Sequence, residues 1–563
     1  MSKKSKIIVI TIILLIALRL WLLASSNWNI ITNSYYDSHL QINEAISLIR
    51  GTWLGAYSKV TLCKGISYPF FLFLLNILHI PYYLGMGMLI IFASWLFTKA
   101  IEPICKNKIF RTIIFAFLLF NPIGFSKESL YHYRNALIPW VVLIVISCIV
   151  GMYLRKEEKI KNMLPYGITG FLSTGFFWLL REDSIWFLPF IFGSLFFTVI
   201  YFFKEKNKIK TLIGKCIVAL LPTLGIVFSV LFISTLNYFV YGIFATNDRT
   251  STYEAKVLGQ LVLIDDGVNL NEDVWVSEKA IDLAKEASPT FKKLDLSPFD
   301  NWPRIGDYSI WALRDSVSNS GYYKDAKETN ELYKKIYKEL KEGFSNGKLQ
   351  KKKAIKLSDT SGVYSKEEIV KPIPIIFTSL YYHATYKYDE VVDEMIDNYD
   401  DINSIEKYEV LLRINLLKKD STLYDNGADY DRIKENNNLR RTLRINKNVS
   451  NSIIFAYKIV GFIVFVVSFI SYIYSIVLLI TKKLSNENRS ILLIMTGLLL
   501  TVFINSYLVW LWGLGFNLKA SDGLFNSYTT AQTIMIVIFE FLSIIVLFSQ
   551  IKKNKIVKKT IKC

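Results

Sequence analysis

The sequence predicts an all-α polytopic membrane protein with about ten transmembrane helices and a mostly helical extracytoplasmic domain. The chain of 563 residues is 52% hydrophobic and 15% aromatic, which is too apolar for a soluble enzyme of this length. Several of its apolar runs reach the roughly 20 residues that cross a bilayer. One long polar segment, 237–451, separates two groups of such runs, and its mixed apolar pattern at helical spacing indicates that it folds.

The net charge of +19 lies in short stretches that border the apolar runs. Because cytoplasmic loops are enriched in Lys and Arg, this placement predicts that these stretches and both termini lie inside the cell. It also excludes nucleic acid as the partner, since the rest of the chain is neutral overall. Six stretches carry the whole excess of basic residues: 1–6, 99–111, 155–161, 204–210, 482–489 and 552–562.

The apolar runs divide the chain into a membrane module 1–236, an extracytoplasmic domain 237–451 and a second membrane module 452–563. The first run is interpreted as a retained anchor, since no convincing cleavage site follows it. The run 68–80 is too short to cross the membrane. The later basic loops lie in the cytoplasm only if this run does not cross. The middles of the spans are expected to be nearly free of charge. The expected spans are 7–24, 82–101, 110–124, 137–154, 163–180, 185–203, 212–236, 453–480, 491–511 and 530–551.

The sequence lacks the motifs of several common kinds of site. None of its five cysteines falls in 245–450, so no disulfide framework or CxxC metal site stabilises the polar segment. No nucleotide-binding or hydrolase motif occurs, among them GxSxG, the Walker A loop, HExxH and the Rossmann fingerprint. Nucleotide-driven chemistry on the inner face is therefore not expected.

The first outer loop is expected to hold an interfacial helix that starts at Asn33 or Ser34. Helical spacing places Asp37, Gln41 and Glu44 within about one face and a run of apolar residues on another. Such a helix next to a span lies in the membrane interface, so Asp37 would stand where lipid meets water. A solvated helix with ordinary surface charges is the alternative.

Ionisable residues also gather in the other outer loops. The second loop, FSKESLYHYRNAL, carries Glu128, His132 and Arg134; the corner LLREDSIWF carries Arg181 and Glu182; and the first loop adds His39 and Lys64. Charges next to lipid usually face a cavity or each other, so these side chains could line one polar cleft. Ordinary charge at helix ends is the alternative.

Two further groups of residues are candidates for ligand binding. His39 and His132 share loops with Asp37 and Glu128, so imidazole and carboxylate groups could bind a divalent cation, although their spacing matches no ligand motif. In the polar segment, Trp311 with Arg314 suits stacking on a sugar or binding a phosphate. A helix that packs its Trp inward and exposes its Arg is the alternative.

The N-terminal half resembles a known family of membrane enzymes. An acidic residue in YYDSHLQINEAISLIRG after the first span, a Tyr-Pro before a short apolar helix, and FNPIGFSKESLYHYRNAL in the second loop are similar to the GT-C glycosyltransferases. That family includes the bacterial aminoarabinose-transferase and protein O-mannosyltransferase-like enzymes. The resemblance covers roughly residues 1–236 and is specific only in the first loop.

The resemblance implies an inverting glycosyltransferase of the cell membrane. It would move a sugar from a polyprenyl-phosphate donor to a glycan, lipid or protein acceptor on the extracytoplasmic face. Asp37 matches the acid that acts as general base; Ser38 stands where the family often has a second acid, with Glu44 the nearest substitute. The expected groups for the donor phosphate and the acceptor are Lys64, Glu128, Arg134, Arg181, Glu182 and Arg314. No cofactor is required, and a divalent cation remains open.

Two other classes of function are compatible with the sequence. A polysaccharide or lipid transporter or flippase would carry ionisable residues deep in several spans and two paired halves. A non-enzymatic membrane scaffold would use the large domain and not the charges at the span ends.

Overall fold

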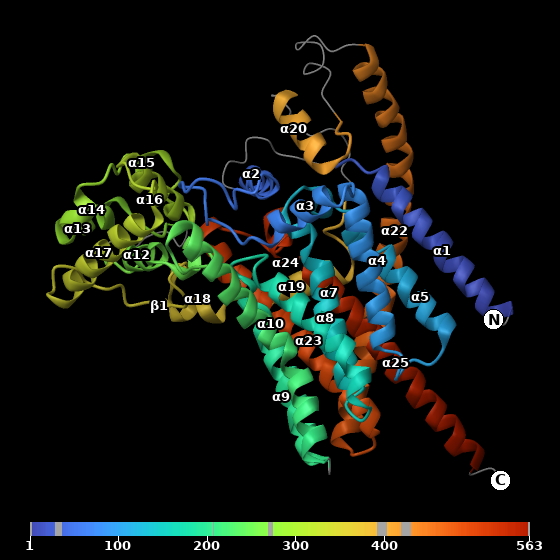
Figure 1. Cartoon of the computed structure of the whole chain (residues 1–563). Helices are drawn as coiled ribbons and strands as arrows, with labels where there is room; N and C mark the ends of the chain where they lie inside the picture. Colours follow the sequence, from blue (N-terminus) through green and yellow to red (C-terminus); the bar gives the residue numbers. More distant parts are fainter. Residues whose placement is uncertain are drawn as a thin grey trace.

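The computed structural model is an all-α membrane bundle with a polar domain at one end (Figure 1). It describes residues 3–28, 37–205, 208–267, 274–390, 402–417 and 430–560. Among them, eight helices are long and apolar enough to cross a membrane, so the predicted polytopic α-helical class is confirmed. The helices that carry these spans are α1 (Lys3–Ala24), α4 (Tyr82–Ala100), α7 (Ile138–Leu154), α9 (Leu188–Lys204), α10 (Ile209–Tyr241), α22 (Tyr430–Ile480), α23 (Asn486–Gly513) and α25 (Ala531–Thr560).

The other two expected spans have a different form. α5 (Lys108–Leu119) continues through η1 (Pro122–Gly124) into α6 (Lys127–Leu130) with a bend of 44°, so this run is one broken span or a re-entrant loop. α8 (Ile160–Trp178) has 19 residues, about 28 Å of helix, but it falls outside the eight. By length and composition the described residues therefore support eight spans, or nine with the bent pair, against the ten predicted.

A glycine allows the close packing of α8 against α10. α8 packs against α7 and α10, and a Cβ added at Gly225 of α10 would lie 2.0 Å from the backbone oxygen of Phe171 on α8. Such backbone contact is possible only where a residue has no side chain. The close contact between α8 and α10 therefore depends on Gly225.

The expectation that the middles of the spans are nearly free of charge is wrong. Arg19 of α1 and Glu540 of α25 are both fully buried within spans. Arg19 donates through Nη2 to the backbone oxygen of Gly124 (3.0 Å) and its guanidinium lies 4.0 Å over the ring of Phe125. A broken helix leaves carbonyl groups without partners, and inside a membrane protein these must find a donor. Arg19 supplies one at the break after α5.

Short helices close the end of the bundle beside the polar domain. The helix of the first loop, α2 (Ser38–Ile49), has Asp37 at its N-terminal boundary; the predicted caps Asn33 and Ser34 lie outside the described residues. Gln41 and Glu44 point into the protein, because α2 is covered by its neighbours on that face, so the alternative of a solvated helix does not hold for these two residues. The remaining short helices here are α3 (Ser67–Ile77), η2 (Arg134–Ala136), η3 (Ser184–Phe187), η4 (Leu514–Phe516) and α24 (Gly523–Thr529).

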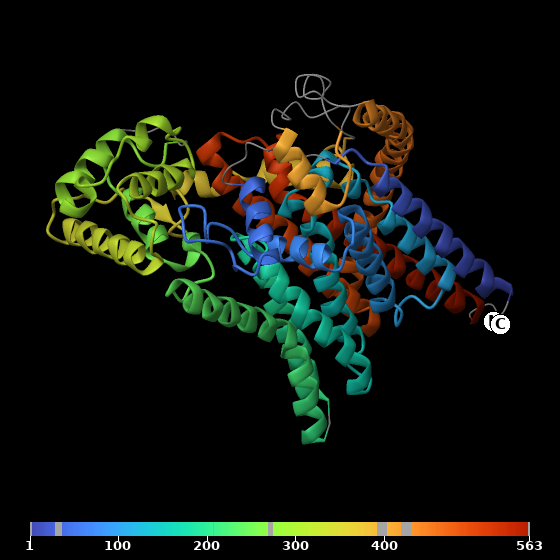
Figure 2. The ribbon, with the colours of Figure 1, turned by 45° about the horizontal axis from the view of Figure 1, so that its top comes forward.

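The polar domain lies beside this end of the bundle in both views (Figures 1 and 2). The helical pattern noted in this segment is realised in α17 (Ala326–Ser345), whose apolar stripe, which includes Tyr333 and Ile336, is buried. Leu40 and Cys63 of the first loop belong to the same core, so the domain packs on that loop. Its elements are α11 (Asp248–Ser251), α12 (Tyr253–Leu261), α13 (Glu278–Ala287), α14 (Pro289–Lys292), α15 (Pro298–Asn301), α16 (Tyr308–Asn319), α17 (Ala326–Ser345), β1 (Ile355–Lys356), β2 (Val363–Tyr364) and α18 (Lys366–Val370).

The last part of the segment 237–451 packs on the bundle instead. Leu380 of α19 (Ile373–Ala384) and Tyr408 of α20 (Ile402–Leu412) belong to the same core as the spans. α22 then starts at Tyr430 and runs for 51 residues without interruption. The polar domain proper is therefore the part before α19.

Candidate active site

Loops that are far apart in the sequence meet around Asp37. The Nζ atom of Lys64 lies 2.9 Å from Asp37 Oδ1, and the hydroxyl of Tyr133 donates to the same oxygen at 3.0 Å. The side chain of Lys64 is 5% exposed and that of Asp37 is 50% exposed, so the cation is buried and the carboxylate reaches the surface. Burial tends to raise the pKa of this carboxyl, but Lys64, Tyr133 and Arg134 hold it below its ordinary value. The carboxylate is ionised at neutral pH.

Glu182 joins three segments at one point. Its Oε1 accepts from Arg134 Nη1 at 2.8 Å and from the backbone N–H of Gly65 at 2.8 Å. Burial opposes ionisation, yet Arg134 keeps the pKa of Glu182 far below its ordinary value. The first loop, the second loop and the corner after α8 are thereby tied together by one buried carboxylate.

Arg181 stands on the other side of the same corner. It donates through Nε and Nη2 to both oxygens of Asp183, at 2.7 and 2.6 Å, and through Nη1 to Oδ1 of Asn135 at 2.9 Å. Its guanidinium lies 4.2 Å over the ring of Tyr528 on α24. A planar guanidinium held in this way presents a fixed fork that suits carboxylate or phosphate. We call Asp37, Lys64, Tyr133, Arg134, Arg181, Glu182 and Asp183 the ion-pair cluster.

The polar domain covers one side of the ion-pair cluster. The ring of Trp311 on α16 lies between two cations, with Lys64 Nζ 5.4 Å and Arg249 Cζ 5.1 Å from its centroid. Arg249 in turn pairs with Asp307 at 2.7 Å. Trp311 is 6% exposed and belongs to the core of this domain, so α16 packs its Trp inward, as in the alternative considered from the sequence.

Glu44 is an acid of a different kind from Asp37. It is 4% exposed, and among the described residues neither of its oxygens has a hydrogen-bond partner. Burial, with the charge of Glu182, raises the pKa of Glu44 well above its ordinary value, so this carboxyl keeps its proton to a higher pH than Asp37 does. Two acids in neighbouring environments whose pKa values are pushed apart are the arrangement that acid–base sites use.

No family model, curated protein or solved structure matches this chain. The site therefore has to be interpreted from its own geometry.

Two of the residues predicted to bind the donor phosphate or the acceptor lie outside the ion-pair cluster. Glu128 accepts a hydrogen bond from Ser527 of α24. Arg314 is fully buried, where it pairs with Glu254 and Asp248 and also donates to backbone oxygens of the first loop. Because its guanidinium is enclosed by these partners, Arg314 joins the polar domain to the loop and is not available to a ligand. The alternative that exposed this arginine is also wrong.

The histidines do not form the cation site considered from the sequence. His39 Nδ1 lies 2.6 Å from the hydroxyl of Tyr408, whereas His132 is buried against Tyr82 at 4.3 Å between ring centroids. Burial lowers the pKa of His132 to about 3, so it is neutral. No group of three or more potential metal ligands occurs in the part of the chain that the structure describes.

Several members of the site carry no sequence signal. Tyr133 sits among other aromatic residues in its loop, and Tyr528 is far along the chain from Arg181. Arg249 and Asp307 belong to the polar domain, whose contact with the first loop cannot be inferred from spacing. Asp183 was visible as part of the charged corner, but its bidentate pairing depends on the turn after α8.

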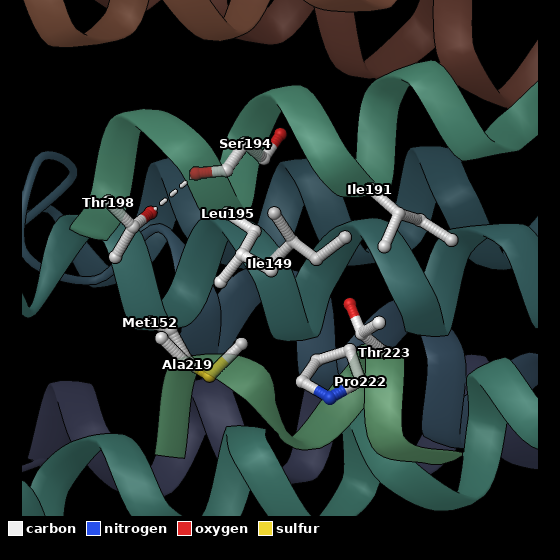
Figure 3. Close-up of a pocket in the computed structure, with 9 residues that line it drawn as sticks. All are labelled: Ile149, Met152, Ile191, Ser194, Leu195, Thr198, Ala219, Pro222 and Thr223. Carbon is white, nitrogen blue, oxygen red and sulfur yellow. Dashed lines mark hydrogen bonds between the residues drawn. The ribbon is translucent and has the colours of Figure 1, made fainter. Parts of the chain in front are cut away.

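Apolar hollows lie deeper in the bundle. One is enclosed by α7, α9 and α10, where Thr198 donates to the backbone oxygen of Ser194 at 2.7 Å (Figure 3). A wider groove runs between α9 and α23, from Pro189 and Ile504 to Phe197 and Leu493. No charged residue lines either hollow. Pro189 lies six positions after Asp183, so the groove begins just below the ion-pair cluster.

Proposed function

We propose that this protein is an integral membrane glycosyltransferase that uses a polyprenyl-phosphate sugar as donor. The observation that carries the proposal is the ion-pair cluster, in which an ionised, half-exposed carboxylate stands beside fixed cations at the membrane-side mouth of the polar domain. A lipid-linked sugar keeps its phosphate at the membrane interface, so this is the depth at which a catalytic carboxylate would meet it. The basic excess at the opposite end of the bundle supports an extracytoplasmic site.

In the proposed reaction Asp37 is the general base. The acceptor hydroxyl oxygen bonds to the anomeric carbon of the donor while the bond from that carbon to the phosphate oxygen breaks. The hydroxyl proton passes to Asp37, and the polyprenyl phosphate leaves with the electron pair of the broken bond. Attack opposite the leaving group inverts the anomeric configuration.

Lys64 and Arg181 are the proposed partners of the leaving phosphate. Fixed cations that meet charge as it develops lower the barrier to such a step. The phosphate would compete with Asp183, whose side chain is 41% exposed, for the fork of Arg181. If it also draws Lys64 away from Asp37, the pKa of this carboxylate rises and it becomes a stronger base when donor is present.

The groove between α9 and α23 supports a lipid-linked donor. Its lining is apolar and it starts close below Arg181 and Asp183, so a polyprenyl chain could lie in it while the phosphate stays at the cluster. The polar domain, which brings Trp311 to the site, is the proposed binding region for the acceptor.

The decisive experiment compares Asp37→Asn with the unchanged protein in lipid nanodiscs. The probes are polyprenyl phosphates carrying mannose, glucose or aminoarabinose, each tested with glycan, lipid and protein fractions of the cell envelope as acceptor, and the measurement is release of polyprenyl phosphate. We expect release by the unchanged protein with one of them, and a loss of about 10²-fold or more in Asp37→Asn, the usual contribution of a general base. Asp300→Asn, at an exposed carboxylate of the polar domain, is the control and retains full activity.

Two outcomes would count against the proposal. Release that survives Asp37→Asn in correctly folded protein removes Asp37 as the base. Absence of release with every donor, in protein that elutes as a single species, removes the donor class.

The second candidate is a transporter or flippase, and Glu540 is the observation that favours it. Oε1 of this buried glutamate has no hydrogen-bond partner among the described residues, and an acid inside a span is a frequent mark of a transport pathway. Glu540→Gln separates the two functions, because it should abolish transport of a lipid-linked sugar across a vesicle membrane and leave sugar transfer intact. Arg19 does not favour transport, since it serves the break after α5.

A further inference from the structure

α19 lies where the polar domain meets the membrane bundle. Just before it, the backbone oxygen of Ile369 accepts from the hydroxyl of Tyr507 near the end of the long α23 (3.3 Å). One turn further into the bundle, Phe503 of α23 contacts Phe377 of α19, with 6.0 Å between ring centroids. α19 therefore begins beside the last turns of α23 and packs along them.

One face of α19 is fixed to the bundle by polar contacts. Ser379 lies 3.0 Å from Oε1 of Gln532, and the two ring nitrogens of His383 each lie 2.9 Å from a threonine hydroxyl, those of Thr529 and Thr533. These side chains are buried. The helix is thus held in one orientation about its own axis.

The opposite face of α19 is apolar and exposed. Ile373, Phe377 and Tyr381 follow one another at intervals of four, which places them in line along the helix. They are 60%, 55% and 40% exposed, and Val370 at the end of α18 is 70% exposed. We call these four residues the exposed stripe.

Exposure of these apolar side chains to water is energetically unfavourable. Each large apolar side chain left in water costs burial free energy, and a row of them normally marks an interaction site. The stripe also continues onto α23, where Leu500, one turn below Phe503, is 54% exposed on a helix that spans the membrane. Leu500 also lines the apolar groove between α9 and α23, and an apolar side chain exposed on a spanning helix is expected to face lipid, so we expect lipid to reach α19 as well.

Lysines lie at the two ends of the exposed stripe. Lys366 precedes it, Lys371 lies between its first two residues and Lys387 follows it, and all three are exposed. Lys387 also lies over the ring of Tyr381, at 4.7 Å from Nζ to the centroid. Lysine stems cover apolar surface while their ammonium groups reach the headgroups, and such groups attract anionic lipid.

We propose that α19 is a membrane-surface helix whose exposed stripe lies in the lipid leaflet on the side of the polar domain, with Lys366, Lys371 and Lys387 bound to anionic phospholipid headgroups. The polar domain is then anchored at a second place besides its connection to α10. This inference is independent of the proposed enzymatic activity, since it rests on α18, α19 and α23 alone.

Lipid quenching of a fluorescent label tests the proposal on the full chain. Phe377→Cys and Ile373→Cys are each labelled with bimane in protein whose Cys216 and Cys563 are replaced by serine, and Glu286→Cys on the exposed face of α13 is the matched control. The proteins are placed in nanodiscs that contain lipid with a doxyl group near the headgroup. For a helix buried at the boundary of headgroups and chains we expect roughly two-fold quenching at 373 and 377, and none at 286.

Each outcome decides one part of the proposal. Lack of quenching at both 373 and 377 overturns it, and oxidative dimers of Phe377→Cys in that case would identify a second copy of this chain as the occupant. For the headgroup contact, quenching should increase when phosphatidylglycerol replaces half of the phosphatidylcholine. Combined replacement of Lys366, Lys371 and Lys387 by Gln should remove this increase, and equal quenching of the unchanged protein in both lipids would overturn the contact.

Discussion

The buried pair of Arg134 and Glu182 should be the main electrostatic support of the site. Their side chains are 5% and 13% exposed and their charged atoms lie 2.8 Å apart. Removing one partner of such a pair leaves an unpaired buried charge, which costs about 3–5 kcal/mol. Glu182→Gln and Arg134→Met should therefore each destabilise the fold by that amount, which would total roughly 6–10 kcal/mol if the two effects were independent.

The double variant should lose much less stability than this sum. With both charges gone, the amide oxygen that Glu182→Gln introduces can still accept from the N–H of Gly65, and the main remaining loss is the donor to the backbone oxygen of Leu180. An unsatisfied buried carbonyl costs about 1–3 kcal/mol, so we expect the double variant Arg134→Met, Glu182→Gln to be more stable than either single variant. The reason is that a neutral site carries no charge that needs a partner.

Unfolding in mixed dodecylmaltoside and SDS micelles, followed by tryptophan fluorescence, measures these free energies. Arg304 and Glu278 provide the control cycle, because their pair is 3.3 Å long and its glutamate is 77% exposed; its variants should change stability by less than about 1 kcal/mol. A double variant as unstable as the sum of its single variants would refute the reasoning. Single variants that lose no more stability than the control variants would also refute the reasoning.

Two further predictions concern buried groups. The folded-state pKa of Glu44 is raised above the ordinary 4.5, so the unfolded chain releases this proton first and the stability of the fold falls as pH rises above that value. In melting curves from pH 5 to 7.5, the melting temperature of Glu44→Gln should therefore rise relative to that of the unchanged protein. A difference in melting temperature that does not change with pH would contradict the raised pKa. Gly225→Ala should lower the free energy of unfolding by about 1–3 kcal/mol or more, the usual range for overpacking, because its Cβ would clash with the backbone of Phe171. Gly193→Ala in α9 is the control: its Cβ meets no atom within 4 Å, so unfolding in the same micelles should be unchanged.

Patterns along the chain predicted the membrane class and most of the spans. Apolar runs and their basic borders depend only on neighbouring residues, so α1, α4, α7, α9, α10, α23 and α25 lie close to their expected ranges. α8 also lies close to its expected range but is less apolar than the eight spans, and the run after α5 is bent. The bend could not be predicted from hydropathy, because the donor that serves it, Arg19, comes from another helix.

For the candidate site, the sequence identified most of the charged residues but not their contacts. Asp37, Lys64, Arg134, Arg181 and Glu182 could be identified because charge at the end of a span is unusual in any sequence. Their pairing could not be predicted, because it depends on how three loops approach one another.

The sequence by itself determined that this chain enters a membrane and that acids and bases stand at the ends of its spans, because hydropathy and charge are properties of each residue and its neighbours. Only the tertiary structure decided that Asp37 has a lowered pKa and reaches the surface while Glu44 has a raised pKa and is enclosed, and that Arg314 is a structural residue. Burial and pairing are properties of distant segments brought together, and the free energy of a charge depends on them.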